Sequence, residues 1–139
     1  MRFLIDTNIF LEVILEQEKA EEARAFLAKT KEHNFFISDY ALHSIGLLLF
    51  RRKQHDVFQQ FVEDMMLNAG LIMISLLAED MEAVVNAARR FNLDFDDAYQ
   101  YVAAEKYDLT IVSFDGDFDR TERGRKTPGT VLRGELWER

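Results

Sequence analysis

The chain has 139 residues, which is enough for one domain and leaves little room for a second. An apolar fraction of 48% and twelve Phe can supply a substantial core, which argues against a disordered chain. The net charge of −8 excludes binding to nucleic acid by bulk charge alone, and the absence of Cys excludes disulfides, thiolate nucleophiles and Cys-ligated metals.

The hydrophobic pattern predicts strands alternating with helices along the whole chain. Gly70 and Asn92 are predicted helix stops, and Asp94 is a predicted N-cap. In chain order, the predicted elements are a strand over 2–5, a helix over 19–32, a strand over 35–37, helices over 40–50 and 55–68, a strand over 71–76, helices over 79–91 and 95–107, a strand over 109–113 and an edge strand at Val131-Leu132.

This order of elements indicates an α/β fold with a parallel sheet, formed by residues 1–139 as a single domain. The nearly continuous apolar strands are typical of a sheet that helices cover on both faces. The start, MRFLIDTNIF, becomes acidic too early for a signal peptide, and no apolar run approaches the roughly 20 residues that span a bilayer. We therefore expect a cytoplasmic protein without a membrane partner.

Three apolar runs end directly in acids. Residues 2–5 lead to Asp6, residues 35–37 lead to Asp39, and the last main strand leads to Asp115, with Asp117 and Asp119 beyond it. Ligands of open α/β sheets bind outside the carboxyl ends of the strands, so these acids are expected to share one cleft. Asp96 and Asp97 open a helix that leads back into the sheet, and they can reach the same edge.

Carboxylates gathered at close range need cations or protons to neutralise them. Oxygen ligands without His or Cys favour Mg²⁺ or Mn²⁺, and such a site can hydrolyse a phosphodiester. Each acid also has a structural interpretation. Asp6 can cap a turn, Asp97 can favour a helix dipole, the segment DGDFD at 115–119 can be a solvated turn, and Asp39 is expected to cap the following helix.

Two known metal motifs do not account for residues 115–119. An EF-hand starting at Asp115 would need Gly at Arg120 and Glu at Lys126. A haloacid-dehalogenase-type phosphatase carries D-x-D near the start of its domain, whereas Asp115 lies near the end of this one. Neither motif fits.

Other side chains are given structural roles. His43 is expected to be a hydrogen-bonded core residue, and the three His suggest no metal site. Most of the apolar stretch at 45–50 is expected to be core, with part of it available to a partner. Four Met residues are expected to fill the core, namely Met65, Met66, Met73 and Met81.

Three segments together resemble the PIN-domain ribonucleases, in particular the VapC-like toxins of type II toxin–antitoxin modules. They are LIDTNIFLE at 4–12, FISDYALHSIG at 36–46 and LDFDDAYQYVAAEKYDLTIVSFDGDFDR at 93–120. Their order in a chain of this length is what makes the resemblance specific. It implies a three-layer α/β/α sandwich around a mainly parallel sheet of four to five strands.

The resemblance also implies the site residues. Asp6, with Asn8 as a polar helper, corresponds to the family's first acid, and Asp97, which is followed by Ala98, corresponds to its late-helix acid. Asp115 and Asp117 correspond to the acids after the last main strand. The metal and catalytic set that we predict is therefore Asp6, Asp97, Asp115 and Asp117.

One departure bears on activity. The family's second segment carries a Glu on the helix after the second strand, whereas this chain has His43-Ser44 there. Asp39, Asp96, Ser44 and His43 are possible substitutes, and none of them is chosen on sequence alone.

The function implied is cleavage of RNA by metal-activated water, with Mg²⁺ or Mn²⁺ as cofactor. The implied partners are a small antitoxin protein and a second copy of the chain. Arg120, Arg123, Arg125 and Lys126 are candidate contacts to RNA phosphates or a solvated basic loop. The alternatives are a catalytically weak or silent PIN-like module that binds RNA or protein, and a phosphatase acting on small phosphate esters.

Overall fold

A computed structural model describes residues 1–138. Its elements follow the order β1 (Arg2–Ile5), α1 (Thr7–Ile14), α2 (Ala20–Leu27), β2 (Asn34–Ser38), α3 (Asp39–Arg51), α4 (His55–Phe61), the π-helix η1 (Val62–Asn68), β3 (Ile72–Ile74), the 3₁₀ helix η2 (Ala78–Asp80), α5 (Met81–Phe91), α6 (Phe95–Tyr107), β4 (Thr110–Val112), the 3₁₀ helix η3 (Gly116–Arg120) and α7 (Pro128–Glu138). Among these helices, none has the length and apolar composition needed to cross a bilayer.

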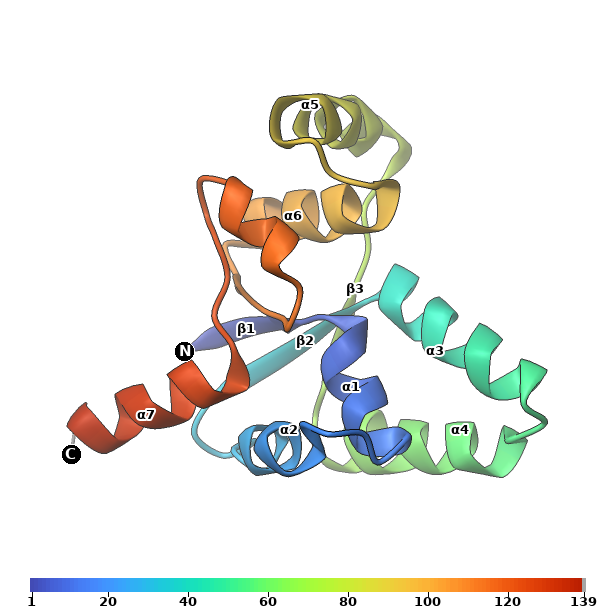
Figure 1. The fold of residues 1–139 in the computed structure, drawn as a ribbon. Helices are drawn as coiled ribbons and strands as arrows, with labels where there is room; N and C mark the ends of the chain where they lie inside the picture. The colour runs from blue at the N-terminus through green and yellow to red at the C-terminus, as the bar shows by residue number, and fades with distance from the viewer. Residues whose placement is uncertain (139) are drawn as a thin grey trace.

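The four strands form one parallel sheet in the order β3-β2-β1-β4. Strands β2 and β3 follow β1 on one side of it, and β4 pairs with β1 on the other side. Figure 1 shows α5 and α6 on one side of the sheet and α1, α2 and α4 on the other. The predicted three-layer α/β fold with four to five parallel strands is confirmed.

The central strands β1 and β2 are buried on both faces because alternate residues enter two separate cores, whereas Ile72 and Met73 of the edge strand β3 are exposed. Phe3 and Ile5 of β1 pack in the core shared with α1 to α4 and α7, whereas Leu4 between them packs in the core shared with α5 and α6. In β2, Phe35 and Phe36 divide in the same way. This two-sided burial explains why the strands read as continuous apolar runs.

Helix ends follow local chemistry. Asn92 and Asp108 end α5 and α6 in the left-handed conformation, with φ of 54° and 53°, so the predicted stop at Asn92 is confirmed. Gly70 has φ of 81° after η1. Asp94 occupies the N-cap position of α6, although its side chain makes no capping hydrogen bond.

The predictions depart from the structure at one missing helix and at two predicted elements. Helix α1 is missing from the predicted elements, although Asp6 caps it and Ile9 and Phe10 bury its inner face. The helix predicted over 19–32 ends at Leu27, and none of the residues 28–33 that follow it is buried.

The predicted edge strand at Val131-Leu132 is wrong, since both residues lie in α7. Pro128 takes the first helical position, which suits its fixed φ, and Val131 packs into the core. A single parallel bridge, between Val112 and Lys126, extends the sheet beyond β4 instead.

The apolar stretch of α3 divides between core and surface. Ile45 and Leu49 are fully buried, whereas Leu47 is 44% and Phe50 is 51% exposed. Met73, which was expected in the core, is 50% exposed.

This division predicts unequal effects of two truncations in α3. Ile45→Ala should lower the free energy of unfolding by about 2–5 kcal/mol because it leaves a cavity in the core. Leu47→Ala should lower it by less than about 1 kcal/mol, because the side chain already meets solvent. Urea unfolding measures both, and equal losses would contradict the placement of α3.

Candidate active site

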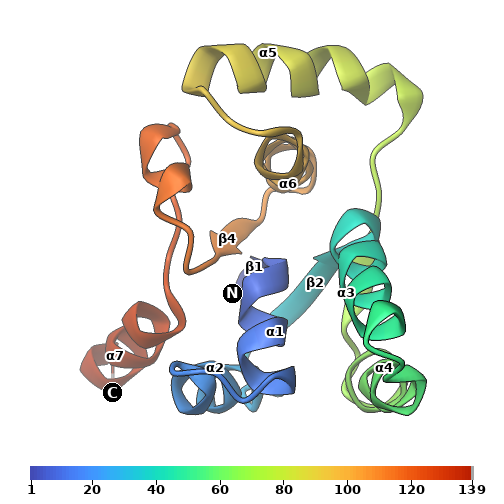
Figure 2. The same cartoon turned by 45° about the vertical axis from the view of Figure 1, so that its right-hand side comes forward.

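The candidate site lies where β1 and β4 end side by side. The backbone N–H of Asp6 donates to the carbonyl of Val112 at 3.0 Å, which holds the two strand ends together. The connections that leave these neighbouring strands run to opposite faces of the sheet, so a crevice opens between them. Figure 2 shows β1 and β4 adjacent beneath α6.

Asp6 is held by several neutral donors. Its Oδ1 accepts from the Thr7 backbone at 2.8 Å and from Gln100 Nε2 at 3.2 Å. Its Oδ2 accepts from Ser113 Oγ at 2.6 Å and from Asn8 Nδ2 at 3.4 Å. The side chain is therefore fixed at the bottom of the crevice, and the residue is only 9% exposed.

Asn8 and Ser113 join the two strand ends through their side chains. Asn8 Nδ2 donates to Ser113 Oγ at 3.2 Å, and Asn8 Oδ1 accepts from the Phe114 backbone at 3.2 Å. Ser113 Oγ also accepts from the Asp115 backbone at 2.9 Å. The predicted role of Asn8 as a polar helper agrees with these contacts.

Three of the four predicted acids form a compact cluster. Asp97, Asp115 and Asp117 each offer a carboxylate oxygen, and these oxygens lie within 4.8 Å of one another. Asp97 lies in the first turn of α6, Asp115 caps η3, and Asp115 Oδ1 accepts from the Asp117 backbone at 2.8 Å. Asp6 lines the same pocket but is not part of this close set.

The charges in the cluster raise the proton affinity of its most buried member. Burial raises the pKa of Asp97 to about 7, and the negative charges of Asp115 and Asp6 add to the shift. Burial also raises the pKa of Asp6, although the hydrogen bonds that it accepts act in the opposite direction. In the metal-free protein, a proton therefore competes for the position that a cation would take.

Asp6, Asp97 and Asp115, but not Asp117, line a pocket of about 260 Å³ whose opposite wall is α3. Tyr40 and Ser44 of α3 and Asp96 of α6 belong to its lining, together with Leu11. Burial raises the pKa of Tyr40, Ser44 opposes that shift and Asp96 adds to it. Thus two of the possible substitutes for the missing Glu, Ser44 and Asp96, reach the pocket.

The other two, Asp39 and His43, do not line this pocket. Asp39 Oδ1 accepts from Tyr99 Oη at 2.7 Å, and Ser38 rather than Asp39 caps α3, with its Oγ accepting from the Ala41 backbone at 3.0 Å. The expected capping role of Asp39 is therefore wrong. His43 is exposed, so its expected role in the core is also wrong.

Three of the four basic residues at the end of η3 and in the loop that follows it bind the protein itself. Arg120 donates to Asp117 Oδ1 at 3.0 Å and to the carbonyls of Phe91 and Asn92 at the end of α5. Arg125 pairs with Asp119 Oδ1 at 3.1 Å and Oδ2 at 3.2 Å. These contacts order the loop, which is thus not a freely solvated basic segment.

The third of these arginines completes the pattern. Arg123 donates to Asp108 Oδ1 and to the Leu109 carbonyl, each at 3.1 Å. Like Arg120, it connects the loop to the end of a neighbouring helix.

Sequence reasoning missed Gln100 and Tyr40 as members of the site. Gln100 lies three residues after Asp97, and Tyr40 lies four before Ser44, so each shares a helix face with a residue that was considered. That spacing was the available signal. Gln100 is 1% exposed, and its Oε1 has no hydrogen-bond partner in the structure.

The donor set fits a hard divalent cation. The close cluster consists of carboxylates alone, without nitrogen or sulfur donors, and such sets suit Mg²⁺ or Mn²⁺. Their mutual repulsion gives the cation a further electrostatic advantage. Asp97, Asp115 and Asp117 are the residues that could hold it.

Comparison with solved structures places the fold among toxin structures. A toxin–antitoxin complex from Klebsiella pneumoniae superimposes with a TM-score of 0.67 at 21% identity, over 90% of this chain and 96% of the other. VapC20 of Mycobacterium tuberculosis, a Sarcin-Ricin loop cleaving toxin, gives 0.70 at 19% identity over 84% and 92%. VapBC2 from Rickettsia felis, bound to a DNA fragment from its promoter, gives 0.72 at 17% over 91% and 97%.

At these identities the likeness shows a shared fold. A comparison with curated proteins found no significant match. The family model named PIN domain matches residues 3–124, which include both strand ends, the acidic cluster and the wall of the pocket. The chain therefore belongs to the PIN-domain family.

Proposed function

We propose that this chain is a divalent-metal-dependent endoribonuclease and the toxin of a type II toxin–antitoxin module. The observation that carries the proposal is the cluster of Asp97, Asp115 and Asp117 at the crevice of a PIN domain. The structurally similar VapC20 is a Sarcin-Ricin loop cleaving toxin, which supports RNA as the substrate.

Each acid has a proposed role. Asp97, Asp115 and Asp117 would hold Mg²⁺ or Mn²⁺. When bound, such a cation would polarise the phosphate and lower the pKa of an attacking water. Arg120 holds Asp117 from the side away from the sheet through its contacts to the end of α5. Asp6 stays in the predicted set because its charge contributes to the raised pKa of Asp97, and its four donors keep it oriented.

A small antitoxin and a second copy of the chain are the proposed protein partners. The similar structures include toxin–antitoxin complexes. We place the antitoxin on an apolar groove of about 470 Å³ between α3, α4 and β3, where exposed apolar side chains gather. Its lining is Asp39, Leu42, His43, Gly46, Leu47, Phe50, Phe58 and Met73.

The second candidate is a PIN-like module that binds RNA or protein without turnover. Ser44 favours it, because this uncharged side chain lines the pocket from α3, where the family pattern has a Glu. Amide substitutions of the acids and an acidic substitution of Ser44 distinguish the two candidates.

Removing one cluster carboxylate should abolish cleavage. Asp97→Asn, and separately Asp6→Asn, should lower Mn²⁺-dependent cleavage of RNA by about 100-fold or more, because a metal ligand or the charge beside it is lost. Asp94→Asn, an exposed acid on the same turn that does not line the pocket, is the control and should leave the rate unchanged. RNA that stays intact with the wild-type protein and Mn²⁺ would favour the silent module.

Supplying the missing acid should strengthen the site. Ser44→Glu should lower the Mn²⁺ dissociation constant by about tenfold, because a further negative charge then faces the cation. Ser44→Gln has the same size without the charge and is the matched comparison in titration calorimetry. Equal Mn²⁺ affinity of the two variants would show that Ser44 does not face the cation.

The raised pKa of Asp97 makes stability depend on pH. Between about pH 4 and 7 the folded, metal-free protein keeps a proton that the unfolded chain has released, so its stability falls as pH rises through this window. Asp97→Asn removes that contribution. The Tm of Asp97→Asn minus that of wild type, both measured with a chelator, should therefore be larger at pH 8 than at pH 5 by about 3 °C or more.

Asp94→Asn again serves as the control and should show no such change between the two pH values. A Tm difference for Asp97→Asn that is equal at pH 5 and pH 8 would contradict a pKa near 7.

A further inference from the structure

An aromatic cluster adjoins the acidic pocket. Its members are Tyr40, Phe95 and Tyr99, whose ring centroids lie 6.0–6.3 Å from one another. Tyr40 lines the acidic pocket and also a neighbouring hollow of about 330 Å³ that Tyr99 lines as well. Tyr40 therefore connects the aromatic cluster to the acidic pocket.

Tyr99 is fixed by its hydroxyl group, and Tyr40 packs against both Phe95 and Tyr99. Tyr99 Oη donates to Asp39 and accepts from the Leu76 backbone at 3.0 Å. Phe95 has no polar group and rests against these two rings.

Phe95 is exposed, although the residues two positions before and after it are buried. Its exposed fraction is 57%, whereas Leu93 is 7% and Asp97 is 9% exposed. Phe95 lines neither hollow itself, but it packs against Tyr40, which lines both, so its exposed ring presents a flat, uncharged face next to the candidate site.

The charge of the chain makes such a face useful to an RNA ligand. With a net charge of −8, the protein repels phosphates, and Arg120, Arg123 and Arg125 already bind acids of the chain. Base stacking on aromatic rings is independent of charge and tolerates any base sequence. It can therefore add affinity that electrostatics does not supply here.

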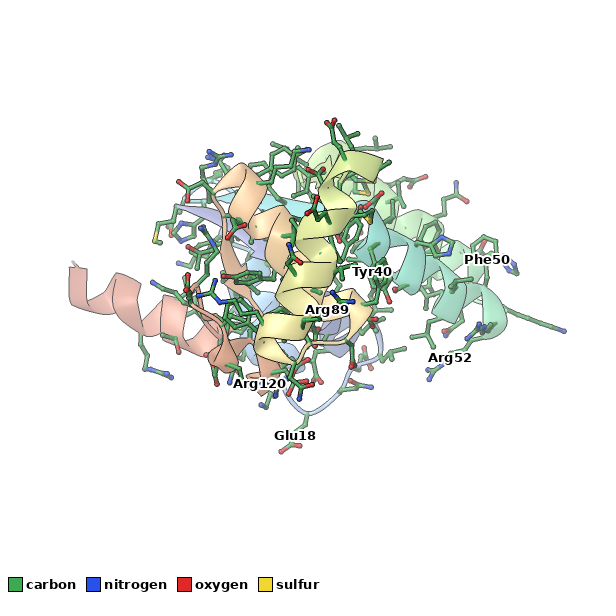
Figure 3. The ribbon with its side chains drawn as sticks, turned by 90° about the horizontal axis from the view of Figure 1, so that it is seen from above. Glu18, Tyr40, Phe50, Arg52, Arg89 and Arg120 are labelled. Carbon is green, nitrogen blue, oxygen red and sulfur yellow. The ribbon has the colours of Figure 1, made fainter. Side chains whose placement is uncertain are left out.

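We propose that the aromatic cluster is a base-stacking subsite for single-stranded RNA, with Phe95 as the ring that receives the base. This inference rests on the proposed function. The base of a nucleotide next to the cleaved phosphate stacks on Phe95, Tyr40 and Tyr99 hold that ring in place, and the phosphate faces the acidic pocket. Figure 3 shows Tyr40 between α5 and the start of α3, with Phe50 toward the other end of α3.

The first test separates binding from chemistry in RNA cleavage with Mn²⁺. Phe95→Ala should raise KM by about tenfold or more, the loss typical of one stacked base, and change kcat by less than about threefold. Phe95→Trp should restore KM, since it returns a ring. Leu67→Ala, which removes a 74% exposed apolar side chain from η1, is the control and should match wild type.

The second test uses oligoribonucleotides with one abasic site moved along the strand. With wild type, one position should raise KM as much as Phe95→Ala does, and the Phe95→Ala variant should not respond to that abasic site. A KM of Phe95→Ala equal to that of Leu67→Ala, or an abasic effect equal in both proteins, overturns the subsite. Altered self-association of Phe95→Ala with unchanged RNA kinetics assigns the cluster to a protein contact instead.

The subsite and the proposed function can fail separately. If wild type cleaves no RNA, the nuclease proposal fails, and the subsite is then tested by fluorescence of RNA containing 2-aminopurine. Quenching by wild type that Phe95→Ala loses supports a stacking site in a binding module. No quenching by wild type overturns the subsite as well.

Discussion

The repulsion between carboxylates at the ends of β1 and β4 is the constraint around which this molecule is organised. Asp97, Asp115 and Asp117 bring oxygens within 4.8 Å of one another, and Asp6 lies in the same pocket. Like charges at this distance are tolerated only with protons, cations or strong hydrogen-bond donors nearby. The structure supplies donors to Asp6, a guanidinium to Asp117, and a pKa near 7 for Asp97. A divalent cation would neutralise the repulsion that remains between the carboxylates, and for this reason the arrangement supports metal chemistry.

The rest of the fold keeps these acids together. A parallel sheet aligns the carboxyl ends of β1 and β4, and Asn8 and Ser113 bind one another across them. Asp97 arrives from α6, which covers the opposite core from α1, so the acids come from both layers of helices. Arg120 then ties the η3 segment to the end of α5. Loss of any one of these supports would move a charged group relative to its neighbours.

The same negative charge shapes how a nucleic acid could be held. Arginines near the site bind acids and carbonyls of the chain and hold the loop in place. The uncharged surfaces are therefore prominent: the groove along α3, and the aromatic cluster beside the pocket. The groove and the hollow beside the aromatic cluster share Asp39 and His43 in their linings, so the two surfaces adjoin along α3, with Phe50 in the groove and Tyr40 at the acidic pocket (Figure 3). A protein partner and an RNA base would therefore occupy neighbouring surfaces.

Local patterns in the sequence determined the four strands of the sheet and most of the helices, and they placed Asp97, Asp115 and Asp117 at one edge, because parallel strands end at a common edge. Helix α6 is predicted at its observed bounds, Phe95–Tyr107, since strong stop and start signals flank it. Tertiary structure alone decided what depends on contacts between distant segments. Val131 is helical because it packs against the core, Arg120 binds Asp117 and α5 instead of solvent, and Ser44 and Asp96 reach the pocket while His43 does not. The hydrophobic periodicity of a helix does not show which other element each of its faces meets. That packing decides which residues enter the site and which of their neighbours do not.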